Sequence, residues 1–519
     1  MQKILKNERG SVALFVLLSA LFFLVVVTGV AVSFKNKESQ IDSQFEKIKL
    51  SYEKDANQVY NEVINSKKGF SSNYGTIEVI WLDSSTNTIA SAPNEPVIDN
   101  EYFEKVAWRD DGTEFTPTQN SEWYSYNSIA GKEDNTTSKW ANAKNTVDGS
   151  YFVWIPRFAY RIIYWDSAER NYITGYFDGR GMVDVNGNVV TKTVNEEEKQ
   201  ITLDSGINTV TQNGIQYIVH PAFDKSVDNG GWGHKIDGIW VAKYEMSRED
   251  YDSASNSWKP TTARYGGGDI ELNDSNIATI RMVSKPNVTS WRDIGLNRCS
   301  VNSDNYDNSM SSHLIKNSEW GAVAYLTHSQ YGRNGKEISV NQCTGYVTGA
   351  GRGTGTNTIY NSTYAVEEST GLPKAEQQYN GNIGKASSST GNIYGVYDLS
   401  GGAMEYVACF DKLGDSTIII GDNHESSELA TLYSNGTETY KGVLLYNVGK
   451  VGDATKEVYN GETKNWFSDQ SRFVSIDYPA LLRGGRYGNT YSAGIFSSNS
   501  SNGGHLEQFS FRVVLIFDK

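Results

Sequence analysis

The chain has 519 residues and a formal net charge of −14 at pH 7, and this length allows two or more domains, or one large domain with a stalk. Its 32 tyrosines, 12 tryptophans and 49 glycines favour strands, turns and much irregular chain. Because a nucleic-acid partner needs a basic face, the acidic composition argues against one.

The N-terminus predicts a single membrane anchor. A basic tip, residues 1–11, precedes an uncharged apolar run from Val12 to Ser33, long enough to cross a hydrocarbon core of ~30 Å. We expect a transmembrane helix over residues 12–34. The positive flank favours a cytoplasmic tip and an extracellular C-terminal body. A cleaved signal peptide is the alternative, because Gly29-Val30-Ala31 is a small-x-small site.

Residues 35–68 predict a helical stalk, because Ile41, Phe45, Ile48 and Tyr52 recur every three or four positions. Glu8-Arg9-Gly10-Ser11, followed by the apolar run, resembles the N-termini of bacterial pilin-like proteins. This resemblance implies a homo-oligomer or a pilus partner bound through the stalk. The sequence departs from the type IV prepilin pattern, because Phe15 stands where that pattern has Glu.

Beyond the stalk we expect a β-rich neck over residues 69–150 and a binding domain over residues 151–519. Pro156, within the apolar segment Tyr151–Tyr164, favours an edge strand or a bend between two strands. Ser318 is a candidate cap for a helix. Further predictions are strands at Thr76–Leu82, Ile215–Phe223 and Gly238–Met246, a hairpin turn at Asn186-Gly187, and a helix at Ser318–Leu326.

The last segment, Leu481–Asp518, has a recognisable motif at each end and a polar middle. It opens with Arg483-Gly484-Gly485 and closes with Phe511–Phe517, which is unbroken in its apolar, β-branched character apart from Arg512 and predicts a buried strand. The middle consists largely of Gly, Asn, Ser and Tyr, the residue types that fill antibody binding loops. Long loops of this kind in compact domains are usually functional. A surface loop without a role is the alternative.

Four segments resemble the formylglycine-generating-enzyme family. Gly395–Tyr406 is similar to its G-x-x-D-M-x-G-N-x-W-E-W signature, and Arg483-Gly484-Gly485 with Phe511-Arg512-Val513 to its R-G-G-S-W…G-F-R ending. Gly238–Glu245 and Glu319-Trp320 match an early strand and a helix of the family. The resemblance spans Tyr151 to Phe517. It implies an α+β, C-type-lectin-like fold, with a small twisted sheet, two helices and much irregular loop.

Catalysis is not expected. The family's oxidases use a cysteine pair after R-G-G, whereas Arg486–Ser510 contains no cysteine. The six histidines are scattered, with His220 expected to pack in a strand and His328 to be a cap or surface residue. We therefore expect no catalytic residue, cofactor or metal, although Glu405 stays open between a buried structural acid and a calcium ligand. A formylglycine-type oxidase remains a remote alternative.

The cysteines point to the same conclusion. Cys299, Cys343 and Cys409 include no C-x-x-C, so they form neither a zinc framework nor a disulfide scaffold. One disulfide, between Cys299 and Cys343, and unpaired buried thiols both remain open. Cys409 is expected to be a core thiol.

Other segments resemble the variable proteins of diversity-generating retroelements, among them Trp154–Phe158, His220–Phe223 and Ala493–Phe496. The resemblance implies a ligand surface before the terminal strand, diversified mainly at Asn codons. Aromatic rings would supply contact area, Arg486 a charged fork, and the Ser, Asn and His side chains hydrogen bonds. Phe496 is expected in the core. The implied ligand-binding residues are Arg486, Tyr487, Gly488, Asn489, Tyr491, Ser492, Ser498, Asn499, Ser500, Asn502 and His505.

These observations together predict a non-catalytic, adhesin-like protein in the cell membrane, whose partner is an extracellular protein or glycan. A minor pilin-like structural subunit is the alternative from another class.

Overall fold

The chain divides into two units, Met1–Ser66 and Lys67–Lys519. The predicted tip, transmembrane helix and stalk lie outside the described residues, as do Asn186-Gly187, Cys299 and His505. Within the part that is described, no helix combines the length and the apolar character needed to cross a membrane. The computed structural model describes residues 75–83, 86–129, 134–165, 196–198, 201–252, 257–260, 281–288, 310–343, 346–351, 373–411, 429–433, 449–461, 464–504, 506 and 508–517.

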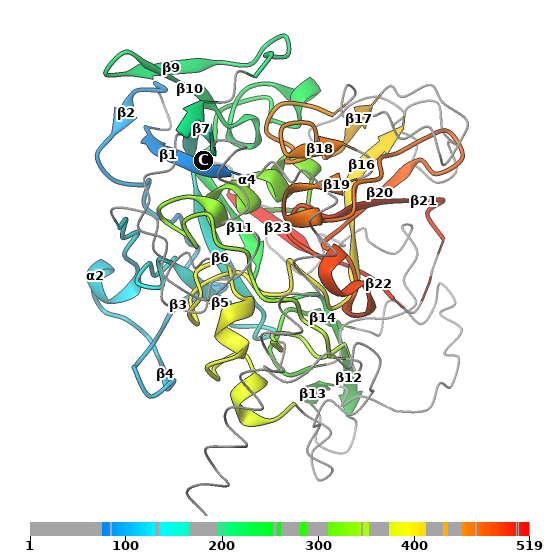
Figure 1. Cartoon of the computed structure of the whole chain (residues 1–519). Coiled ribbons are helices and arrows are strands. Elements are labelled where there is room, and N and C mark those ends of the chain that lie inside the picture. Colours follow the sequence, from blue (N-terminus) through cyan, green and yellow to red (C-terminus); the bar gives the residue numbers. More distant parts are fainter. Residues whose placement is uncertain are drawn as a thin grey trace, which may run out of the picture. The chain divides into compact units, whose positions relative to one another are not determined.

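The first sheet is built on the long antiparallel pair β1 and β7 (Figure 1). Ile77, Val79 and Trp81 alternate along β1 and are all buried in the main core, which is why this segment forms a strand. The predicted strand at Thr76–Leu82 is confirmed. The described strands run in the order β2-β1-β7-β10-β9, with β8 on β7: β1 (Gly75–Leu82), β2 (Ile89–Ala90), β7 (Phe158–Trp165), β8 (Glu196–Glu198), β9 (Thr209–Gln212) and β10 (Ile215–Val219).

The second sheet contains the C-terminal strand β23, which lies between β11 and β15 and is buried except at its end. The buried strand predicted at Phe511–Phe517 is confirmed over Val513–Phe517, whereas Phe511 belongs to another strand, which ends before Arg512. Strands from the predicted neck and from the predicted binding domain share this sheet. The described order is β15-β23-β11-β6-β5-β3-β4: β3 (Phe103–Trp108), β4 (Glu114–Phe115), β5 (Asn142–Asn145), β6 (Tyr151–Pro156), β11 (Gly238–Ala242), β15 (Met310–Leu314) and β23 (Val513–Phe517).

The chain passes from the second sheet to the first at Arg157, because β6 ends at Pro156 and β7 begins at Phe158. Of the two predictions for this proline, the bend between strands is correct. Arg157 is completely buried and forms an ion pair with Asp224, with 3.0 Å between Nη2 and Oδ1. It also donates to the Phe223 carbonyl, so the crossing point is fixed by a paired charge.

A third sheet carries the last segment of the chain. Its described order is β17-β16-β20-β21, with β22 parallel to β16: β16 (Met404–Asp411), β17 (Thr431–Tyr433), β20 (Ala480–Arg483), β21 (Ser498–Ser501) and β22 (Phe509–Phe511). Smaller described sheets are β13-β12-β14 and β18-β19: β12 (Ser247–Asp252), β13 (Ser257–Pro260), β14 (Arg281–Val283), β18 (Tyr459–Gly461) and β19 (Lys464–Asn465).

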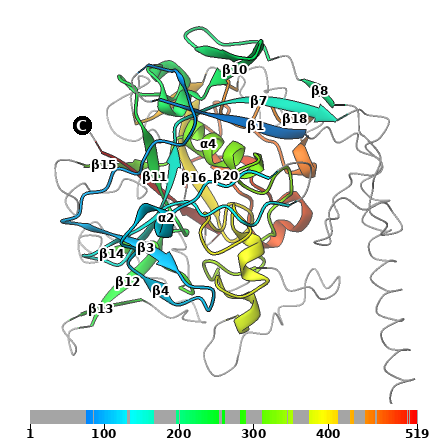
Figure 2. The ribbon, with the colours of Figure 1, turned by 90° about the vertical axis from the view of Figure 1, so that its left-hand side faces the viewer.

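The described residues contain two α-helices, α2 (Asn120–Trp123) and α4 (Asn317–His328), so this part of the chain is mainly β, in agreement with an α+β class at this level. Helix α4 lies between β1 and β16 (Figure 2) and is buried on all sides. The short 3-10 helices are η2 (Pro221–Phe223), η3 (Val227–Asn229), η6 (Ala375–Gln377), η7 (Gly384–Ser387), η9 (Trp466–Ser468) and η10 (Tyr487–Ser492).

Two predictions about α4 are wrong. The helix begins one residue before Ser318, whose hydroxyl instead donates to the Gly230 carbonyl at 2.6 Å. The Glu319 carboxylate accepts from the Lys316 N–H at 2.8 Å and supplies the cap. His328 is not a surface residue, because it is completely buried and burial lowers its pKa to about 3.

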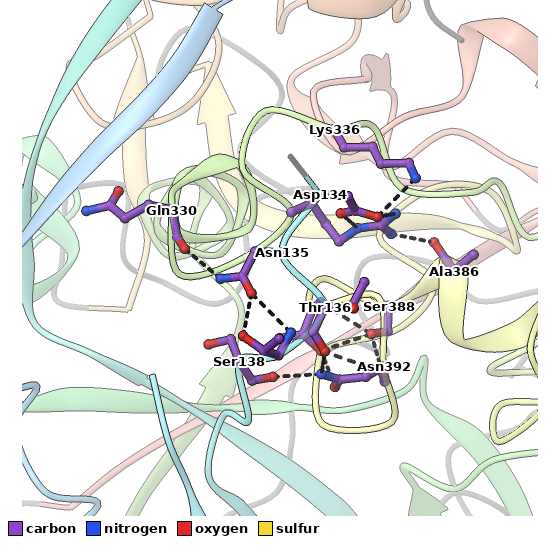
Figure 3. Close-up of polar contacts among 12 residues, drawn as sticks. Asp134, Asn135, Thr136, Ser138, Gln330, Lys336, Ala386, Ser388 and Asn392 are labelled. Carbon is purple, nitrogen blue, oxygen red and sulfur yellow. Dashed lines mark hydrogen bonds and ion pairs between the residues drawn. The ribbon is translucent and has the colours of Figure 1, made fainter. Parts of the chain in front are cut away.

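A polar segment, residues 134–138, connects two loops of the fold (Figure 3). Asp134 forms an ion pair with Arg333 at 2.8 Å. Asn135 donates from Nδ2 to the Gln330 carbonyl at 2.7 Å, and Asn392 donates to the carbonyl of residue 138 at 2.7 Å. This segment therefore joins the chain that follows α4 to the loop that precedes β16.

Glu457 is a buried carboxyl that contacts α4 through Tyr325. It accepts from the hydroxyls of Tyr160 and Tyr325 and from the Gly452 N–H. Burial raises its pKa to about 7, despite the two tyrosine hydrogen bonds, which act in the opposite direction. The group is therefore largely protonated in the folded protein at mildly acid pH.

We expect Glu457 to make stability depend on pH. Its pKa is higher in the folded chain than the ordinary 4.5, so its contribution is complete below pH 4.5 and is lost as pH rises through 7. Relative to Glu457→Gln, the wild type should lose up to about 3 kcal/mol of unfolding free energy across this interval. Urea unfolding at a series of pH values measures this, and parallel profiles for the two proteins would contradict it.

Candidate ligand-binding surface

The predicted ligand-binding segment begins from a buried arginine at the end of β20. Arg483 is completely buried and donates from Nη2 to the Ala454 carbonyl at 3.1 Å and to the Ile495 carbonyl at 3.4 Å. Its guanidinium lies 5.7 Å from the Trp320 ring centroid. Burial lowers its pKa to about 10, so the group is still charged at neutral pH. The segment is thereby fixed to α4 and to the loop before β18.

Two glycines then turn the chain. Gly484 and Gly485 have φ of +83° and +70°, which side chains rarely adopt. A Cβ on Gly485 would also lie 2.8 Å from the Cα of Ala493. Gly484 exchanges hydrogen bonds with the other limb of the segment, donating to the Ser497 carbonyl and accepting from the Gly494 N–H. The two limbs are therefore joined at their base.

Helix η10 presents the first half of the predicted site. The Tyr487 N–H donates to the Gly402 carbonyl at 2.8 Å. Arg486 and Asn489 close a small ring, in which the Arg486 N–H donates to Asn489 Oδ1 and the Asn489 N–H to the Arg486 carbonyl, both at 2.8 Å. These three bonds are all made within the chain, so they form without a partner.

Strand β21 presents the second half and is less accessible. It pairs antiparallel with β20, with Asn499 opposite Leu482. Ser498 and Ser500 are 1% and 8% exposed, so these two predicted contact residues lie inside the protein. Asn499 is half-buried, with its Nδ2 3.9 Å from the sulfur of Met404. Asn502, just beyond the strand, is exposed.

The predicted residues therefore fall into three groups: the buried Ser498 and Ser500, those outside the described part, and those that are half-buried or exposed. The side chain of Tyr491 lies outside the described part, although its backbone belongs to η10, and so does all of His505. Phe496 is completely buried and stacks on Phe467, which confirms its expected core position. The half-buried or exposed members, which form the candidate surface, are Arg486, Tyr487, Gly488, Asn489, Ser492, Asn499 and Asn502.

The segment 470–472 connects the two halves and was not anticipated from the sequence. The Gln470 N–H donates to the Ser492 carbonyl at 3.0 Å, and its carbonyl accepts from the Ser498 N–H at 2.8 Å. The Arg472 N–H donates to the Ser498 carbonyl at 3.1 Å. Gln470 and Arg472 are half-buried, so a partner that touched both η10 and Asn499 would pass over them.

Strained backbone lies beneath the candidate surface. Tyr346, Ala454 and Phe467 have φ of +53°, +52° and +58°, a conformation that costs about 1–3 kcal/mol for a side-chain residue. Each contacts the C-terminal segment: Tyr346 through the ring of Tyr487, Ala454 through Arg483, and Phe467 through Phe496. No sequence signal marks these positions, because Gly or Asn would be the local choice.

Glu405, left open by the sequence, is a buried acid bound to Arg512. Its carboxylate accepts from Arg512 Nε at 3.0 Å and Nη2 at 2.7 Å. Burial raises the Glu405 pKa, and Arg512 acts against that rise. Within the described ranges no three His, Cys, Asp or Glu residues gather as metal ligands would. Because both Glu405 oxygens accept from Arg512, the geometry favours the buried structural acid over the calcium ligand.

The two cysteines that the structure describes, Cys343 and Cys409, are both buried. Cys409 is completely buried, as predicted for a core thiol, and burial raises its pKa well above the ordinary value. Such a thiol is a poor nucleophile and metal ligand at neutral pH.

We expect Gly485→Ala to lower the unfolding free energy by about 2–4 kcal/mol, because it combines a strained φ with a clash against Ala493. Gly488→Ala is the matched control. A Cβ there meets nothing closer than 3.9 Å, so its effect should stay within about 0.5 kcal/mol. Urea unfolding measures both, and equal effects would show that the Gly485 turn is not constrained as described.

We expect Arg512→Met to cost about 3–5 kcal/mol, because it leaves the Glu405 carboxylate buried without its cation. The double variant Glu405→Met/Arg512→Met should be more stable than Arg512→Met alone. Unfolding free energies of the wild type, both single variants and the double variant measure the coupling, and simply additive losses would contradict it.

Comparison with known proteins adds little to this geometry. No protein-family model and no curated protein matches the chain. Among solved structures, the chain has weak similarity to Treponema denticola variable protein 1, with 12% sequence identity and a TM-score of 0.22 over 60% of this chain and 99% of that chain. At that TM-score the similarity carries no argument about fold or function.

Proposed function

We propose that this chain is a non-catalytic, membrane-anchored surface protein whose C-terminal segment binds an extracellular protein or glycan. The observation that carries the proposal is the candidate surface itself. Tyr487 and Asn489 are half-buried on the short helix η10, Arg486 is half-buried just before it, and the buried Arg483 fixes the base of this segment. A surface held in place before binding loses little conformational entropy when a partner arrives.

The residue types of this surface suit recognition by contact. A tyrosine offers rigid apolar area, an arginine offers a planar fork of donors, and asparagine and serine offer adaptable hydrogen bonds. Tyr487, Arg486, Asn489 and Ser492 supply these groups in η10 and the residue before it. The surface holds no described cysteine, so it does not provide the thiolates on which a formylglycine-type oxidase depends.

Three finer features belong to the proposal. The apolar run Val12–Ser33 supports the single-pass anchor, with the C-terminal body extracellular. The four segments that match the formylglycine-generating-enzyme family in the same order support a C-type-lectin-like fold. The resemblance to retroelement variable proteins supports diversification of the surface. Diversification would act on η10, Asn499 and Asn502, whereas the buried Ser498 and Ser500 would support the strand. A near-identical template repeat beside the gene would be its genetic signature.

We expect residues 67–519 to bind specific cell surfaces, or members of glycan and protein arrays, and a four-alanine variant of the candidate surface to lose at least roughly tenfold in affinity. Binding by cytometry and array fluorescence measures this, with circular dichroism to verify folding. The variant replaces Arg486, Asn489, Ser492 and Asn502.

A matched control replaces exposed residues of similar type, far along the chain, and should bind as the wild type does. Equal binding by both variants would move the site elsewhere on the protein. Binding by none of the three proteins would contradict the ligand-binding proposal and favour the pilin-like structural alternative. The control replaces Arg109, Ser121, Asn127 and Ser128 by alanine.

A further inference from the structure

We propose that Tyr346, a residue outside the C-terminal segment, positions the Tyr487 turn of the candidate surface before any partner binds. The two rings meet edge to face, with centroids 4.9 Å apart and planes at 83°, which is a favoured arrangement of aromatic pairs. Tyr346 is 3% exposed, whereas Tyr487 is half-buried. The inference deepens the proposed function, because it assigns a role in binding to this turn. Its test, however, needs no binding partner.

The backbone of Tyr346 indicates why this residue stands here. Its φ of +53° lies in the left-handed region, which bulky side chains rarely adopt and which glycine or asparagine adopts readily. Its N–H donates to the Cys343 carbonyl at 3.0 Å. A tyrosine kept in a conformation suited to glycine points to a role for its ring, and the ring contacts Tyr487.

Hydrogen bonds to Asp398 fix the loop that carries Tyr346. Asp398 accepts from the Gly349 N–H at 2.8 Å and from Asn341 Nδ2 at 2.8 Å. The Asn341 carbonyl accepts from the Gly402 N–H, and the Gly402 carbonyl accepts from the Tyr487 N–H, both at 2.8 Å. The loop therefore reaches Tyr487 by two routes, through the Tyr346 ring and through the Gly402 peptide.

Because the two routes differ in chemistry, substitutions can separate the effect of the Tyr346 ring from the effect of the backbone. Tyr346→Asn tolerates the positive φ but removes the ring. Tyr346→Phe keeps both the ring and the strain. A residue that acted only through its backbone would respond to the first change with equal or greater stability and with no change at Tyr487.

The test is amide hydrogen exchange of the full chain in detergent, without ligand. In Tyr346→Asn, the amides of Tyr487 and Asn489, both hydrogen-bonded in the turn, should exchange roughly two- to tenfold faster. In Tyr346→Phe they should exchange at the wild-type rate. The Gly494 amide, bonded to the Gly484 carbonyl, is the internal reference and should not change in either variant.

A second variant keeps the test decisive if Tyr346→Asn folds poorly. Tyr487→Leu removes the same ring contact from the half-buried side and should accelerate the Asn489 amide to a similar extent. Unchanged exchange in Tyr487→Leu, or equal acceleration in Tyr346→Asn and Tyr346→Phe, would overturn the proposal. Because no partner enters the measurement, its failure is distinguishable from a failure of the binding screen.

Discussion

The buried pair of Glu405 and Arg512 holds together the parts of the fold on which the candidate surface depends. Besides its two bonds to Glu405, Arg512 donates from Nη1 to the Ala242 carbonyl at 2.7 Å and from Nη2 to the Tyr397 carbonyl at 2.8 Å. One guanidinium therefore joins β11, the loop before β16, and β16 itself. Such a pair stabilises only when the remaining donors also find acceptors, and here the two carbonyls supply them.

Arg157 occupies a position in the fold similar to that of Arg512. Arg512 separates β22 of the third sheet from β23 of the second, and Arg157 separates β6 of the second sheet from β7 of the first. Both are completely buried and both are paired with a carboxylate. At each point a strand changes sheets, and its backbone groups change partners there. A cation with several donors suits such a point, because it can bond to backbone carbonyls as well as to its carboxylate: to Ala242 and Tyr397 for Arg512, and to Phe223 for Arg157.

The elements that could be predicted from the sequence are those with an apolar pattern. Thr76–Leu82, the bend at Pro156 and the strand after Arg512 follow from alternation, from proline chemistry and from an unbroken apolar run. The cap of α4 was missed because Glu319 acts from inside the helix, whereas Ser318 bonds to a distant loop. The burial of His328 depends on Phe467 and Phe496, which are far from it in sequence.

The position of the candidate surface in the chain could be predicted from the sequence, but the burial of its individual residues could not. The boundaries Arg483 and Phe511 are visible as motifs, and the polar run between them marks a loop. Serine, however, carries no hydrophobic signal that would distinguish the buried Ser498 from the half-buried Ser492. Their difference arises from the pairing of β21 with β20, a tertiary event that local sequence does not encode.

The arginines that border this segment have a consequence for how the protein can change. Arg483 and Arg512 are both completely buried and bonded to distant parts of the chain, so the two ends of the segment are fixed independently of what lies between them. Lengthening a loop whose ends are already fixed adds only a slowly growing entropy term. Next to the exposed Asn502 and Gly504, inherited insertions and deletions could accumulate without disturbing the frame, and the reach of the surface could evolve along with its chemistry.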